Sequence, residues 1–71
     1  MDEERRARLL KLQRMEATEA EVYRRLARMQ KDEVNRSILE GISLEEERHE
    51  VVIAGMTGEK VRPDMRKVRR Q

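Results

Sequence analysis

The apolar residues in the first half of the chain recur at helical spacing. Residues 3–30 contain no Gly or Pro, and strong helix formers dominate them. Asp2, Glu3 and Glu4 suit the positive end of a helix dipole. The apolar positions share one face of the predicted helix, as in an amphipathic helix. They are Leu9, Leu12, Tyr23 and Leu26, with Met15 and Val22 beside them.

A second apolar stripe follows and ends at a helix stop. Asp32 is a suitable N-cap, and Gly58, after Thr57, is a natural left-handed C-cap. We therefore predict a second helix over about residues 33–57, and an all-α antiparallel hairpin spanning residues 1–58. The stripe consists of Val34, Ile38, Leu39, Ile42, Ile53 and Met56.

The break between the two helices is weakly marked. Residues 31–35 contain no Gly or Pro, and only Asp32 favours a new helix start. One continuous helix over residues 3–57, in a long coiled coil, is therefore the alternative to the hairpin.

The composition indicates that the hairpin needs a partner. Of the 71 residues, 37% are apolar and 45% are charged, and Phe and Trp are absent. One hairpin of this kind buries too little apolar surface to offset its chain entropy. Cysteines are absent, which excludes disulfides and thiolate zinc sites. We expect an even-numbered homo-oligomer in which hairpins dimerise into a four-helix bundle.

The end of the chain differs in charge from the rest. Residues 59–71 carry 6 basic and 2 acidic side chains, against 11 and 13 in residues 1–58. We expect a basic, mostly mobile tail with a short helical turn after Pro63. It lacks aromatic interleaving and any nucleic-acid-binding signature, so nucleic acid is not the expected partner. No apolar run reaches membrane-span length and no signal peptide opens the chain, so no membrane association and a cytoplasmic location are expected.

Four ionisable residues interrupt the apolar stripes. Glu16 and Glu19 project between the apolar residues of the first helix, and Glu46 and His49 follow the line of Ile42 on the second. Burying an unpaired carboxylate is costly, so such groups are normally paired, protonated or bound to a metal. An arginine is the other available partner for Glu46, since 13 of the 17 basic residues are Arg.

In an antiparallel hairpin these residues come to one level. The positions of Glu16 and Glu46 average 31, and those of Glu16 and His49 average 32.5, both within the predicted turn. Glu46 and His49 form a Glu-x-x-His motif, whose spacing lets both side chains reach one metal. Carboxylates with imidazole suit iron or manganese, and zinc is also possible. A two-fold dimer doubles the set to four Glu and two His, the ligand inventory of a di-iron carboxylate bundle.

These motifs resemble those of ferritin-like, rubrerythrin-type proteins over about residues 9–68. The similar stretches are Leu9–Arg14, Glu16–Glu19, Tyr23–Ala27, Glu45–Glu50, Thr57-Gly58 and Val61–Pro63. The sequence is similar to the ferritin-like domain that precedes vacuolar-iron-transporter-type membrane domains. Its metal spacing is similar to that of encapsulated ferritins, two-helix proteins whose di-iron site forms between subunits.

The resemblance implies a role for each site residue. Glu16 would be the first-helix ligand, Glu46 would bridge two irons per dimer, and His49 would be a terminal ligand. Tyr23 would lie close to the site and is the candidate catalytic residue, while Glu19 would be a further ligand or a metal-entry carboxylate. The implied activity is ferroxidase-type iron oxidation or peroxide detoxification.

The sequence also departs from the family. A complete ferritin-like domain has four helices in one chain, whereas this sequence supplies two. The tail does not resemble a capsid-targeting peptide, so an encapsulating shell is not expected. A metal-free helical bundle or coiled-coil interaction module is the alternative function, and a small basic-tailed nucleic-acid binder is a third.

A separate face of the second helix carries Leu44 and Val51, with Gly41, Arg48 and Gly55 on the same line. Glycines permit close helix approach. We therefore hypothesise a second interface there, which would join dimers into a larger assembly; exposed apolar residues beside two tolerated glycines are the simpler interpretation.

Overall fold

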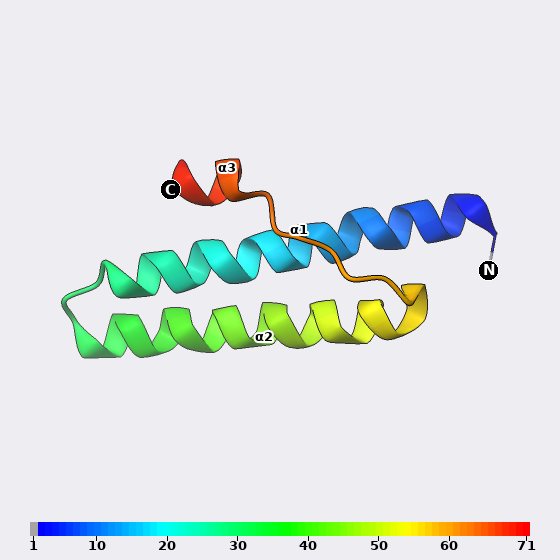
Figure 1. Cartoon of the computed structure of the whole chain (residues 1–71). Coiled ribbons are helices and arrows are strands. Elements are labelled where there is room, and N and C mark those ends of the chain that lie inside the picture. Colours follow the sequence, from blue (N-terminus) through cyan, green and yellow to red (C-terminus); the bar gives the residue numbers. More distant parts are fainter. Residues whose placement is uncertain (1) are drawn as a thin grey trace.

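A computed structural model describes residues 2–71; Met1, which the predicted domain included, lies outside the described residues. The described chain forms α1 (Glu3–Arg28), α2 (Glu33–Thr57) and the short α3 (Met65–Arg69). Figure 1 shows α1 and α2 running antiparallel, with α3 on the other side of α1. The all-α hairpin prediction is confirmed, and the alternative of one continuous helix is wrong.

The chain reverses without glycine because side chains and a tight turn satisfy the helix ends. The backbone N–H of Met29 donates to the carbonyl of Leu26 at 3.1 Å, and the Gln30 amide donates to the same carbonyl at 3.3 Å. Asp32 then starts α2 by accepting a hydrogen bond from the Val34 N–H at 2.9 Å. Within residues 2–71, positive φ occurs only at Gly58, so the turn itself needs no left-handed residue.

The contact between α1 and α2 is made by small and polar residues. Ala20 and Ala27 are buried on α1, and Ser43 and Ile53 are buried on α2. The Ser43 hydroxyl donates to the Ala20 carbonyl at 2.7 Å across the two helices. Small side chains allow the helices to approach closely. Dispersion contacts between the close backbones therefore stabilise this α1–α2 seam in place of large apolar side chains.

Most of the predicted apolar stripe lies outside this seam. Leu12, Val34, Ile38 and Met56 are 41–66% exposed, and only Ile53 of the second stripe is buried. The reason is the rotation of each helix about its axis. Small residues such as Ala20 and Ala27 face the other helix, so the larger apolar side chains point toward one flank of the hairpin.

A polar network closes the open end of the hairpin. Gln13 is fully buried; its amide donates to Glu50 at 2.9 Å and to the Glu59 carbonyl at 2.8 Å, and it accepts from the Thr57 hydroxyl at 2.7 Å. Gly58, with φ of 70°, provides the predicted left-handed C-cap and directs the chain back across α1.

The basic tail packs along α1, whereas the sequence predicts a mostly mobile tail. The predicted helical turn after Pro63 is present as α3. The Asp64 N–H donates to the Thr18 hydroxyl at 2.9 Å, and the Asp64 side chain caps α3. Val68 is only 3% exposed. The reason is that Val61 and Val68 offer apolar contact area to α1, which the charge count of the tail concealed.

The molecule is a thin layer. Its principal extents are 46 × 22 × 14 Å, so a single layer of two helices, with the tail, makes up the described chain. No helix formed by residues 2–71 combines the length and apolar character needed to cross a membrane.

Candidate metal centre

The hairpin brings three predicted ligands together at mid-length. Glu16 projects from α1, and Glu46 and His49 project from adjacent turns of α2. One ligand atom from each lies within 4.8 Å of the others. His49 Nδ1 is 3.3 Å from a Glu16 carboxylate oxygen and 3.7 Å from one of Glu46. The predicted common level of these residues is therefore confirmed.

The two carboxylates are mostly shielded and have little positive charge near them. The side chains of Glu16 and Glu46 are each 16% exposed, whereas His49 is 56% exposed. Over residues 2–71, the ion pairs of these two carboxylates are those with His49, and arginines pair with other acids. The alternative of an arginine partner for Glu46 is not what the described chain adopts.

Glu19 contacts Glu46 but lies outside the group of three converging ligands. A hydrogen bond with Glu46, burial and the negative charge of Glu46 raise the pKa of Glu19 above its ordinary value of 4.5, and the Lys67 ammonium opposes the rise. The ligand atoms that lie within 4.8 Å of one another come from Glu16, Glu46 and His49, so the role of Glu19 as a metal ligand stays a prediction.

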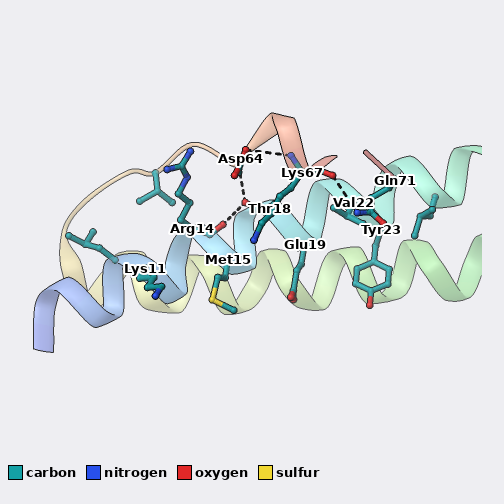
Figure 2. Close-up of a pocket in the computed structure, with 13 residues that line it drawn as sticks. Lys11, Arg14, Met15, Thr18, Glu19, Val22, Tyr23, Asp64, Lys67 and Gln71 are labelled. Carbon is teal, nitrogen blue, oxygen red and sulfur yellow. Dashed lines mark hydrogen bonds between the residues drawn. The ribbon is translucent and has the colours of Figure 1, made fainter. Parts of the chain in front are cut away.

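Tyr23 lies one turn beyond Glu19 on α1. Figure 2 shows its ring projecting from the same side of the helix as Glu19 and Met15. Tyr23 is partly buried, and its hydroxyl makes no hydrogen bond within residues 2–71. Tyr23 and Glu19 thus lie on one side of α1, and the catalytic role of Tyr23 stays a prediction.

An open groove of about 820 Å³ runs between α1 and the tail (Figure 2). Glu19 and Tyr23 line it together with Lys67, which reaches across from α3. The groove therefore reaches Glu19, whereas Glu16, Glu46 and His49 do not line it. The contribution of Lys67 was missed in the sequence, because the tail was expected to be mobile.

The donor set fits a divalent cation but leaves its coordination incomplete. Two carboxylates and one imidazole from one chain are a set that iron, manganese and zinc accept. These metals take four to six ligands, and one hairpin supplies three. A second set of protein ligands from a copy of the chain would complete two such sites.

The polar pair Gln13 and Glu50, which lies close to the ligands in sequence, was not predicted as a feature of the site. Gln13 and Glu50 are hydrogen-bonded at 2.9 Å, and they lie three and one positions from Glu16 and His49. The available signal was a line of residues on α2 at spacings of three and four that mixes polar and apolar side chains: Leu39, Ser43, Glu46, Glu50, Ile53 and Thr57.

Comparisons of the chain with protein-family models, with curated proteins and with solved structures give no match.

Proposed function

We propose that two copies of this hairpin pair face to face into a four-helix bundle and hold two iron ions between them. Glu16, Glu46 and His49 of each copy would be the ligands. The observation that carries the proposal is their convergence to within 4.8 Å on facing helices.

The surroundings of the cluster support pairing of two copies. Leu12 lies one turn before Glu16, and Ile38 and Met56 lie two turns from Glu46 and His49 on the same side of α2. These three side chains are 41–56% exposed in the single chain. Exposed apolar residues on both sides of shielded carboxylates are typical of a chain taken out of an obligate dimer whose interface has a polar centre.

The charge of the cluster supports cation binding. Glu16, Glu19 and Glu46 present three acidic groups, with Lys67 and His49 as the neighbouring basic groups. A two-fold pairing would bring six acidic groups together in a site that the apolar band shields from water. Such a site requires cations, because repulsion between carboxylates strengthens at low dielectric.

Each side chain then has a distinct task. Glu46 and its symmetry equivalent would be shared between the two ions. Glu16 and His49 of each copy would together hold one ion. Glu19 would receive incoming ferrous iron from the groove. Bound iron supplies one-electron transfer to oxygen or peroxide. Tyr23 would bound the site and keep it dry, and ferrous iron itself would be the substrate of a ferroxidase.

Anaerobic titration with ferrous iron tests this proposal. We expect about one tightly bound iron per chain, and at least a tenfold loss of affinity in Glu46→Ala and His49→Ala. Glu40→Gln is the matched control, because Glu40 is an exposed carboxylate of α2 without an ion pair in the described chain. Oxygen consumption on adding air to the ferrous protein then measures ferroxidase activity.

The competing function is a metal-free helical interaction module. It predicts no stoichiometric iron, and equal behaviour of Glu46→Ala and Glu40→Gln. Either result would refute the di-iron proposal. Manganese or zinc in place of iron would keep the site and change its chemistry, and titration with each ion separates these cases.

A further inference from the structure

A second apolar surface lies on the far side of α2 from the carboxylate cluster. Leu44 is 53% exposed and Val51 is 63% exposed. They are seven residues apart, two helical turns, and so lie on one line. An open hollow of about 530 Å³ is lined by Leu44, Val51 and Val52 together with Glu47 and Arg48. The pairing proposed above would not cover this line, because it uses the face of Glu46 and His49.

Two glycines lie on the same line of α2, and no contact within the single chain explains why these positions are glycine. Gly41 and Gly55 are both inside α2, where a glycine weakens a helix relative to alanine. A Cβ atom added to either would meet nothing within 4 Å. A second helix backbone that packs closely at these positions would explain both glycines, because any side chain there would keep the two backbones apart.

The line is complementary to itself under a two-fold rotation. An axis between Glu47 and Arg48 places residues whose numbers sum to 95 opposite each other. Leu44 then meets Val51 of the partner, and each Glu47 meets an Arg48 of opposite charge. The two glycines, whose numbers sum to 96, face each other within one position. Apolar, charged and small residues are thus each matched by one operation.

We propose that this surface binds the same surface of a second copy, with the two α2 helices antiparallel about that axis. The surface is separate from the metal centre, so a chain using both faces has two different self-complementary interfaces. Two such interfaces join metal-binding dimers into an even-numbered assembly larger than two chains.

Sedimentation velocity of the full chain tests the proposal. We expect a wild-type species larger than two chains of 8.5 kDa each. Leu44→Glu and Gly55→Leu should both reduce it to the two-chain species, at least a twofold fall in mass. Both positions are solvent-exposed, and circular dichroism verifies that each variant remains helical.

Charge exchange tests the register itself. Glu47→Arg and Arg48→Glu should each weaken the large assembly, because like charges then face each other, and the double variant should restore it. Their partners within the chain, Arg24 and Glu45, form exposed pairs that contribute little. A monomeric wild type, or an assembly that Leu44→Glu and Gly55→Leu leave unchanged in mass, would overturn the proposal. A two-chain wild type that both variants convert to a monomer would support this interface and count against the metal-centre pairing instead. Iron stoichiometry measured on the same variants separates this interface from the metal centre: it should stay at one per chain in Leu44→Glu.

Discussion

Glu19 reports on the electrostatics of the carboxylate cluster even without metal. Its pKa is raised through its contact with Glu46, so the folded chain binds the Glu19 proton more tightly than the unfolded chain does. The associated stability is present below the ordinary pKa of 4.5 and is lost as the pH rises through the folded-state pKa. At neutral pH the ionised Glu19 therefore opposes folding of the metal-free protein.

Glu19→Gln should accordingly stabilise the metal-free protein at pH 7 and above. The gain should shrink as the pH falls below 4.5, because wild-type Glu19 is then neutral as well. Urea unfolding in the presence of a chelator, repeated across this pH range, measures the difference. Glu21→Gln, two residues along α1 and paired with Arg24, is the control. A gain that is independent of pH would contradict the assignment.

Gln13 is fully buried and makes three side-chain hydrogen bonds. Its amide has partners at 2.8 and 2.9 Å, and its oxygen accepts from Thr57 at 2.7 Å. Gln13→Ala removes all three hydrogen bonds and leaves the buried Thr57 hydroxyl without its acceptor, so we expect a loss of about 2–3 kcal/mol in unfolding free energy. Arg8→Ala, an exposed change on the same helix, should cost less than about 0.5 kcal/mol.

At the scale of elements, the caps and the hairpin were predictable and the packing register was not. Asp32 and Gly58 marked the helix ends chemically, and the helices occur where these caps place them. The level of Glu16 and His49 followed from counting residues about the turn. The seam did not, because Ala20, Ala27 and Ser43 carry no large apolar signal, while the apolar stripes pointed to a different face.

The tail was misjudged for a related reason. Its basic side chains suggested full solvation, whereas its docking depends on two valines and a few hydrogen bonds to α1. Val68 is 3% exposed, and Asp64 donates its N–H to Thr18. A short segment needs few contacts to pack along a helix, and the overall composition of the tail does not reveal so few apolar residues.

Val68→Asp should release α3 from α1. Burial of the new carboxylate without a partner would cost several times the lost apolar contact, so the tail should detach while the hairpin stays folded. Tryptic cleavage after Lys67 should become at least tenfold faster, and helicity should fall only slightly. Met65→Asp, an exposed change in the same helix, should leave the cleavage rate near that of wild type.

At the scale of the whole molecule, the hairpin is thin and exposes much apolar surface. It is 14 Å thick in its smallest dimension and leaves ten large apolar side chains exposed. Some of these side chains, such as Leu12, Ile38 and Met56, flank the shielded carboxylates of Glu16 and Glu46. Pairing and metal binding would address both features together, so the two processes should be thermodynamically linked.

Removing metal should therefore weaken both stability and association. With ligand at 100 times its dissociation constant, linkage contributes about 2.7 kcal/mol per site, which a chelator should abolish. Thermal unfolding with and without chelator measures the change, and the dimer should dissociate at higher protein concentration once metal is removed. His49→Ala should show neither response. A wild-type midpoint that the chelator leaves unchanged would contradict the linkage.

The central claim is that one metal centre is shared by two chains. Anomalous diffraction from crystals grown with ferrous iron under anaerobic conditions locates the ions directly. The account predicts two iron peaks about 3.5–4 Å apart across a two-fold axis, each contacted by Glu16, Glu46 or His49 from both copies. A single peak held by one hairpin alone, or no peak at these residues, would contradict it.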